Sequence, residues 1–197
     1  MKFILACFLG AVVSFGWGFV SWTQLGWHEA GMHSFKDETA VAAVIKANAT
    51  RGRGIYVLPG IDTPLSYATP EDKQKTTDAH NKAMTEGPYM YAIVRPGRAD
   101  WDMKRNMLLG LARSLLACAI MAALLGQTVL SYTGRVAFTA GAGVFASLVC
   151  DAQLWIWFES PAREFMVNVA DHFIEWLLVG AVLGVWVGKV PTANDYR

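Results

Sequence analysis

Charged residues are scarce in this sequence of 197 residues. They make up 17% of the chain, whereas hydrophobic residues make up 54%. Such a composition is unusual for a soluble domain and typical of a small polytopic membrane protein. The two signs nearly balance, with a formal net charge of +1, and no basic run occurs. The sequence therefore argues against a nucleic-acid partner.

Other residue patterns are missing too. The chain has only 3 cysteines, all in apolar segments, which fits packing residues better than disulfides or metal ligands: Cys7, Cys118 and Cys150. No glycine-rich phosphate loop occurs, and nothing indicates nucleophilic catalysis. We interpret the serines of the apolar segments as packing or interhelical hydrogen-bonding residues: Ser14, Ser114 and Ser147. We expect no cofactor, and the sequence favours a protein that is not an enzyme.

Four long apolar runs stand out against this background. They predict transmembrane helices over 1–23, about 106–130, 136–158 and 169–188, because about 20 apolar residues cross a bilayer as a helix. A cleavable signal peptide is the competing interpretation of the first run. That run is long, however, and no Ala-x-Ala-like site precedes Trp22. The connection over 131–135 is short, so the second and third helices should form an antiparallel hairpin.

The polar region 24–105 separates the first two apolar runs. A capping-box-like start at Ser34–Asp37 predicts a helix over about 36–47, and Thr69 with Pro70 predicts the start of a second helix that ends near Gly87. The segments 54–60 and 88–97 read as strands that can pair. We therefore predict a mainly α fold, namely a four-helix transmembrane bundle with a small α+β domain inserted between its first two helices.

Orientation follows from the charges of the short loops and ends. With four spans, Lys2, Arg135, Lys189 and Arg197 fall on one side, which the positive-inside rule assigns to the cytoplasm. The segment 24–105 is then extracytoplasmic, and 191–197 is a cytoplasmic tail. Lys104 disagrees with this assignment, as does Arg105, but charge in long translocated segments counts for less.

Three ionisable residues fall inside the predicted spans. Arg113, Asp151 and Glu175 lie at similar predicted depths on three different helices, with His172 nearby. A charge in hydrocarbon costs about 2.5–3.5 kcal/mol on insertion scales, so we expect Arg113 to pair with Asp151. This polar layer has three interpretations: a clamp that fixes helix register, an outward-opening pocket for a proton, ion or small polar ligand, or a metal centre.

The metal interpretation has weak support. Its candidate ligands are of suitable types but match no established spacing: His28, Glu29, His33 and His172. Tryptophans near the outer ends of the spans fit an aromatic belt: Trp155, Trp157 and Trp176. The alternative for these tryptophans is a wall around a bound lipid, quinone or pigment.

Small residues recur at spacing four on the first and fourth spans. They form two smooth faces on which another helix can pack closely: Ala6, Gly10, Ser14 and Gly18, and then Gly180, Gly184 and Gly188. We interpret these residues as helix-packing positions.

Several short motifs occur along the chain in a distinctive order: Phe15–Gly18, Leu25–Glu29, Phe35–Glu38 followed by Val41–Lys46, Tyr56–Gly60, Gly87–Gly97 and Trp155–Trp157. In this order the chain resembles a family of uncharacterised bacterial four-span inner-membrane proteins. The resemblance implies the fold and a multi-pass location in the bacterial inner membrane. It implies no activity and no site residue.

Two function hypotheses follow. The first is a non-enzymatic accessory or scaffold subunit of a membrane assembly, whose partners are the bilayer and other membrane proteins. Its small-residue faces would contact partner helices, and 24–105 would dock a partner outside. The alternative is a small transporter, ion-binding or metal-dependent membrane protein that uses the polar layer at Arg113, Asp151 and Glu175.

Overall fold

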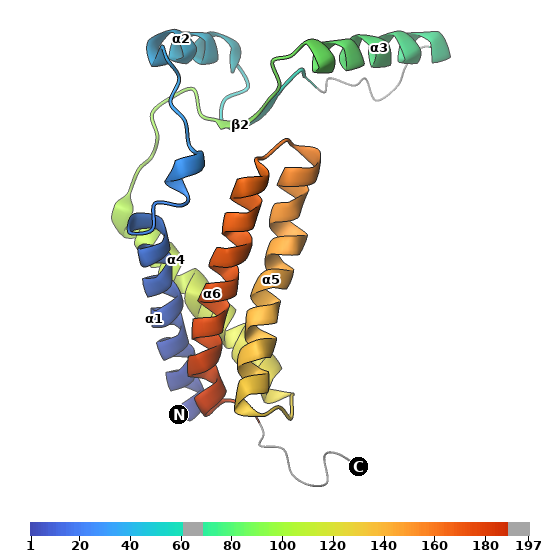
Figure 1. The fold of residues 1–197 in the computed structure, drawn as a ribbon. Coiled ribbons are helices and arrows are strands. Elements are labelled where there is room, and N and C mark those ends of the chain that lie inside the picture. Colours follow the sequence, from blue (N-terminus) through green and yellow to red (C-terminus); the bar gives the residue numbers. More distant parts are fainter. Residues whose placement is uncertain (61–68, 189–197) are drawn as a thin grey trace. The chain divides into compact units, whose positions relative to one another are not determined.

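The computed structural model describes residues 1–60 and 69–188 and is mainly helical (Figure 1). Four helices are long and apolar enough to cross a membrane: α1 (Lys2–Thr23), α4 (Met103–Gly126), α5 (Tyr132–Trp157) and α6 (Ala162–Trp186). Among the described residues, this confirms the prediction of four apolar helices of membrane-spanning length. The expected tail 191–197 lies outside the described residues, as does part of the polar insert.

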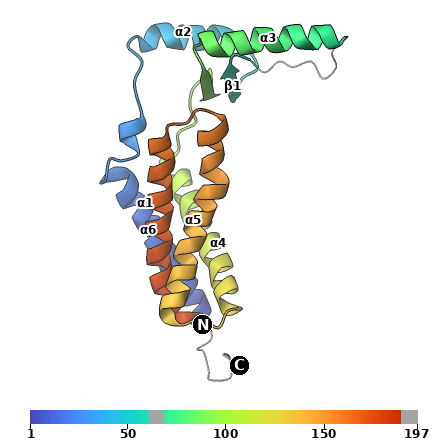
Figure 2. The ribbon, with the colours of Figure 1, turned by 45° about the vertical axis from the view of Figure 1, so that its right-hand side comes forward.

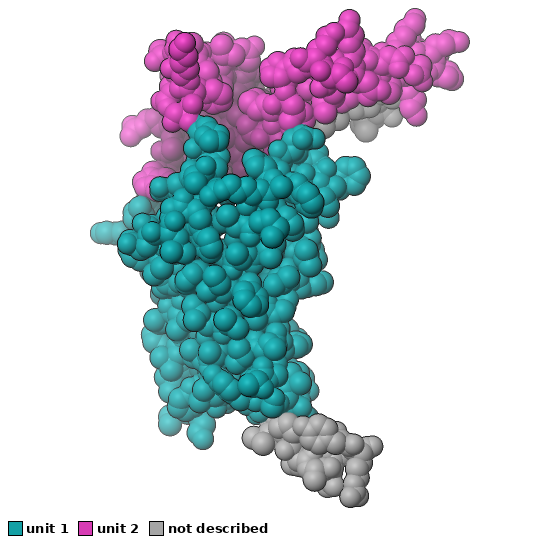
Figure 3. Space-filling view, in the orientation of Figure 1, with its two compact units in different colours: residues 1–33, 102–197 teal, residues 34–101 magenta. Residues whose placement is uncertain are grey.

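The chain divides into two compact units (Figure 3). Unit 1 comprises Met1–His33 and Asp102–Arg197, and unit 2 comprises Ser34–Trp101. Unit 1 holds the four long helices and a short 3-10 turn, η1 (Glu29–Gly31). Unit 2 holds, in chain order, α2 (Glu38–Asn48), β1 (Gly54–Leu58), α3 (Pro70–Glu86) and β2 (Met90–Val94).

Neighbours in the chain are not always neighbours in the bundle of unit 1. Helix α5 packs on α6 along most of its length, and α1 packs on both α4 and α6 (Figures 1 and 2). Helices α4 and α5 run antiparallel but are not a closely packed pair among the described residues. The predicted antiparallel arrangement of α4 and α5 is therefore present, but the closely packed antiparallel pair is α5 with α6.

Glycines explain why α5 and α6 come so close. A Cβ on Gly143 of α5 would lie 2.5 Å from the carbonyl oxygen of His172, and a Cβ on Gly180 of α6 would lie 2.9 Å from Cβ of Thr139. Further along α6, a Cβ on Gly184 would lie 3.3 Å from the Tyr132 ring. The small-residue face of α6 therefore packs on α5 of the same chain.

Gly188, the last glycine of the predicted stripe, is a glycine for a different physical reason. Gly188 has a φ of +103°, and a Cβ there would lie 2.6 Å from Nε of Arg135. Arg135 is buried, and it donates from Nε to the Leu130 carbonyl at 2.9 Å and from Nη1 to the Gly184 carbonyl at 2.9 Å. This arginine satisfies a carbonyl that the end of α6 leaves free.

The stripe on α1 is used inside the chain over most of its length. Ala6 is fully buried, and a Cβ on Gly10 would approach Cys118 Sγ of α4 at 3.2 Å and Leu183 of α6 at 3.3 Å. Gly18 differs, because no described atom lies within 4 Å of the position that its Cβ would take. The small-residue stripe thus packs α1 against α4 and α6, except at its last residue, Gly18, which has no close neighbour among the described atoms.

Helix α6 begins at Ala162, earlier than the start predicted at 169. Its first turns are mixed, with the polar residues Arg163, Glu164 and Asn168 on either side of Phe165–Val167. Hydropathy marks the part of a helix that suits hydrocarbon, whereas the helix itself continues wherever its backbone bonds can form. The predicted connection 159–168 is therefore mostly helical.

Unit 2 is a two-stranded sheet with two helices. Strands β1 and β2 pair, as the sequence predicts, and the pairing is antiparallel with Ile55 opposite Ile93. Thr69 caps α3 as expected, whereas α2 is capped by Asp37, whose carboxylate accepts from the Ala40 amide at 2.9 Å. Among its described residues unit 2 buries only two hydrophobic side chains, those of Ala49 and Val94.

Candidate functional site

A cavity of about 700 Å³ lies inside unit 1, at the end of the bundle where α1 ends and α4 begins. Its apolar wall comes from α1 and α4: Phe15, Trp17, Gly18, Phe19, Trp22, Met103, Met107 and Gly110. Its polar wall comes mainly from α6, with single residues from α1, α4, α5 and the segment after α1: Thr23, His28, Arg113, Asp151, Asn168, Asp171, His172 and Glu175. The predicted layer residues therefore share one cavity.

Arg113 and Glu175 form the deeper part of the polar wall. Arg113 Nη2 lies 3.6 Å from Glu175 Oε1, and the same carboxylate oxygen accepts a hydrogen bond from the Ser14 hydroxyl at 2.5 Å. The hydroxyls of Ser14 and Ser114 are joined by a bond of 2.9 Å. The Glu175 side chain is 10% exposed and the Arg113 side chain 66%. The carboxylate is thus fixed by α1, while the guanidinium faces open space.

Asp151 and His172 form a second ion pair. His172 Nδ1 lies 3.5 Å from Asp151 Oδ2 and 2.5 Å from the Ser147 hydroxyl. Both contacts fall on the same ring nitrogen, so these residues do not form a serine–histidine–aspartate relay, which uses both nitrogens. Asp151 Oδ2 is buried and has no hydrogen-bond partner among the described residues.

The predicted pairing of Arg113 with Asp151 is wrong. Arg113 pairs with Glu175, and Asp151 pairs with His172. The error comes from the early start of α6, which places Glu175 about 20 Å along that helix at 1.5 Å per residue. His172 precedes Glu175 by one turn, so the two ion pairs occupy successive levels of the bundle.

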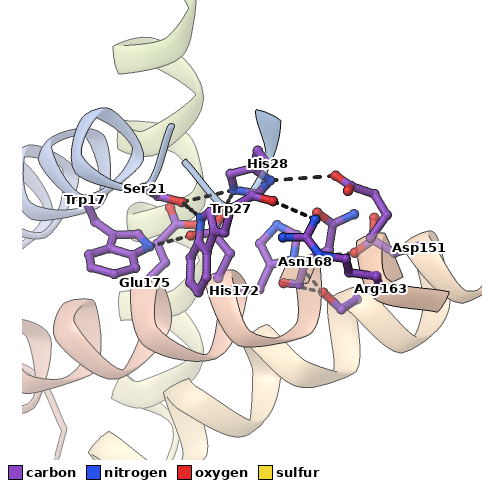
Figure 4. Close-up of polar contacts among 12 residues, drawn as sticks. Trp17, Ser21, Trp27, His28, Asp151, Arg163, Asn168, His172 and Glu175 are labelled. Atoms are coloured by element: carbon purple, nitrogen blue, oxygen red, sulfur yellow. Dashed lines mark hydrogen bonds and ion pairs between the residues drawn. The ribbon is translucent and has the colours of Figure 1, made fainter. Parts of the chain in front are cut away.

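His28 is the buried centre of the outer part of the site (Figure 4). Its side chain is 2% exposed, and its ring stacks on Trp22 with centroids 4.1 Å apart. Its Nε2 lies 3.0 Å from the Ser21 hydroxyl and 3.4 Å from Asp171 Oδ2. Its Nδ1 is 3.8 Å from Glu164 Oε1. The imidazole therefore lies between two carboxylates of α6.

Two further bonds tie the end of α1 to α6 (Figure 4). Trp17 Nε1 donates to Asp171 Oδ1 at 2.7 Å, and Arg163 Nη1 donates to the Trp27 carbonyl at 3.1 Å. Trp27 Nε1 also donates to the Ser21 hydroxyl at 3.0 Å. The sequence predicts His28 only as a candidate metal ligand and does not predict this network. The signal was present in the dense aromatic motif around Trp27 and His28.

The residues considered for a metal are not assembled into a metal centre. Within the described part of the chain, no group of three or more histidine, cysteine, aspartate or glutamate side chains is placed to hold a metal ion. His28 and His172 line the cavity, whereas Glu29 and His33 are not among its lining residues. The arrangement instead offers fixed carboxylates, aromatic faces and one exposed guanidinium.

No protein-family model, no curated protein and no solved structure matches this chain. Function is therefore argued from the geometry of the cavity.

Proposed function

We propose that this chain is a multi-pass protein of the bacterial inner membrane that binds a small organic cation in the cavity of unit 1. The observation that carries the proposal is the lining of that cavity. Three carboxylates face it against one guanidinium, beside the rings of four aromatic residues. The proposal favours the small transporter or ion-binding hypothesis over the scaffold.

Charge supports a cationic ligand. Asp151, Asp171 and Glu175 supply three carboxylates to the lining, against the single guanidinium of Arg113. Buried charges of one sign need a partner, and in a membrane the cost of leaving them unpaired rises further. A bound ammonium group offsets this excess.

The aromatic wall supports an organic cation rather than a metal ion. Trp and Phe rings attract a cation to their faces, with about 0.5–2 kcal/mol per contact depending on desolvation. Trp17 and Trp22 belong to the lining together with Phe15 and Phe19. Alkylammonium groups combine a positive charge with apolar surface, so they suit a pocket of carboxylates and rings.

The orientation proposed here opens the cavity outward. The end of the bundle that holds it is the end at which α1 leads into unit 2. If Lys2 and Arg135 mark the cytoplasmic side, unit 2 and the cavity lie on the extracytoplasmic side.

Equilibrium binding of benzyltrimethylammonium to the purified full chain in maltoside micelles tests the proposal, with benzyl alcohol as the uncharged comparison. We expect saturable binding of the cation alone. Glu175→Gln should weaken it about tenfold, equivalent to about 1.4 kcal/mol, and Asp171→Asn should act similarly. Glu71→Gln, an exposed carboxylate in unit 2, is the matched control. Equal losses in Glu71→Gln and Glu175→Gln, or no saturable binding, would refute the proposal.

A scaffold role keeps one specific observation in its favour, and it lies in unit 2. Ile93 is 78% exposed and its cross-strand partner Ile55 is 59% exposed, on a sheet of only two strands. An isolated two-stranded ribbon is marginally stable in water. Unit 2 therefore offers an apolar strand face to another protein. Replacing both residues by Thr should abolish co-purification of such a subunit while leaving cation binding intact.

A further inference from the structure

A second cavity in unit 1 is almost wholly apolar. Its volume is about 250 Å³, and its lining comes from α4, α5 and a single residue of α6: Ala117, Ile120, Met121, Ala142, Ala146 and Trp176. Small alanines face it from both α4 and α5, and these two helices are not a closely packed pair among the described residues. The apolar cavity is therefore a gap between α4 and α5 with Trp176 of α6 at its side.

The apolar cavity lies next to the polar one along the same helices. Ala117 follows Arg113 by one turn of α4, and Trp176 follows Glu175 directly on α6. Residues four apart on a helix lie on one face. Moving from the apolar cavity toward the start of α4, the lining changes from alanine and isoleucine to the Arg113–Glu175 pair, and then to Asp171 and aromatic rings.

Arg113 occupies the junction and is incompletely neutralised. Its side chain is 66% exposed, about 15 Å along α4 from Met103, and its only described contacts are Glu175 at 3.6 Å and a long hydrogen bond of 3.4 Å to the Ser114 hydroxyl. An exposed guanidinium within a spanning helix is costly unless an anion or water reaches it. Guanidinium groups recognise phosphate through paired hydrogen bonds.

We infer that the ligand of unit 1 is a zwitterionic phospholipid with an amine headgroup. Its acyl chain lies between α4 and α5, its phosphate lies on Arg113, and its ammonium group lies among Asp171, Glu175 and the aromatic wall. This inference rests on the proposed cation site and names the class of ligand. The order chain, phosphate, amine is the order in which the apolar cavity, the Arg113 guanidinium, and Asp171 with the aromatic wall follow one another.

The orientation of the site also suits a lipid. The apolar cavity lies deeper in the bundle than the carboxylates, counted from the start of α4. A lipid of the leaflet on that side points its chain toward the bilayer centre and its headgroup toward the surface. Such a lipid reaches the site sideways through the gap between α4 and α5 without reversing direction.

Four probes separate the parts of the inference in maltoside micelles. Monolauroyl lysophosphatidylethanolamine carries all three groups, dodecyltrimethylammonium lacks the phosphate, monolauroyl lysophosphatidic acid lacks the amine, and benzyltrimethylammonium lacks both phosphate and chain. We expect the first to bind at least about tenfold more tightly than each of the others. Equal affinity for the three long-chain probes indicates non-selective lipid contact and would overturn the inference.

Two substitutions locate the chain and the phosphate. Ala146→Phe fills the apolar cavity and should weaken lysophosphatidylethanolamine about tenfold while leaving benzyltrimethylammonium unchanged. Leu148→Phe, on an exposed position of α5 outside both cavities, should change neither affinity. Arg113→Gln should abolish the preference of lysophosphatidylethanolamine over dodecyltrimethylammonium, and Arg113→Lys should restore part of it.

The outcomes distinguish the two proposals. If benzyltrimethylammonium binds and Ala146→Phe does not change the affinity for lysophosphatidylethanolamine, the phospholipid inference is overturned. The proposed cation site is then still supported. Absence of benzyltrimethylammonium binding overturns the proposed function. If benzyltrimethylammonium does not bind but lysophosphatidylethanolamine binding still depends on Ala146 and Arg113, the positions assigned to the acyl chain and the phosphate remain supported.

Discussion

Gly143 should be the least tolerant glycine of helix α5. A Cβ at this position would lie 2.5 Å from the His172 carbonyl oxygen, 2.8 Å from Trp176 Cδ1 and 3.0 Å from Trp176 Cβ. The nearest atom belongs to the backbone of α6 and cannot rotate away. Gly143→Ala must therefore separate α5 from α6, the most extensively packed pair of the bundle.

The destabilisation that Gly143→Ala causes through close contact can be separated from the change in helix propensity between glycine and alanine. Gly141 lies on the same helix, and no described atom lies within 4 Å of the position that its Cβ would take. Alanine gains about 1 kcal/mol over glycine in a helix interior, and this gain is shared by Gly141→Ala and Gly143→Ala. The difference between the two variants is then the cost of overpacking alone, about 1–3 kcal/mol.

Unfolding of the two variants by SDS titration from maltoside micelles, followed by circular dichroism, measures this difference. Gly141→Ala should unfold at the same SDS fraction as the unmodified chain or a higher one. Gly143→Ala should unfold at a lower fraction. If Gly143→Ala is as stable as Gly141→Ala, the close contact of α5 with α6 does not exist, and the position of His172 in the cavity wall loses its basis.

Two further predictions concern single hydrogen-bonding side chains. Arg135→Met should lower the free energy of unfolding by about 1–3 kcal/mol, because it leaves the carbonyls of Leu130 and Gly184 without their donor; an unchanged value in the same SDS titration would show that this arginine is not buried. Trp17→Phe keeps an aromatic side chain, although a smaller one, and removes the indole donor to Asp171, so it should cost about 1.5–3 kcal/mol, whereas Trp101→Phe, at an exposed position, should be neutral within about 0.5 kcal/mol.

Much of the architecture could be predicted because it depends on local pattern. Length and apolarity mark the four spans, and the Thr69–Pro70 start marks α3, since each signal lies within a few residues of the element it specifies. The start of α6 could not be predicted in this way. Its first turns include polar residues that bond to the segment after α1, more than 130 residues away in sequence, as in the bond between Arg163 and Trp27.

The candidate site, like the fold, could be predicted only in part. Burial cost indicates that Arg113, Asp151 and Glu175 need partners, and the cavity brings all three together. Which residue pairs with which depends on the rotation and offset of each helix, and a shift of a single turn is enough to exchange the partners. The role of His28 was beyond prediction for a related reason, because its neighbours come from α6 and lie far along the chain.

The packing order of unit 1 bears on how the protein is made. Helix α1 touches both α4 and α6, whereas α4 has no other close partner among the described helices. Ribosomes deliver α1 to the bilayer first, so α4 finds its one partner already inserted when it emerges. The pair of α5 and α6 follows as a tight unit and docks on a helix that is already in place. The order of the helices along the chain is thus the order in which they assemble. Helix α1, which is made first, supports the later helices.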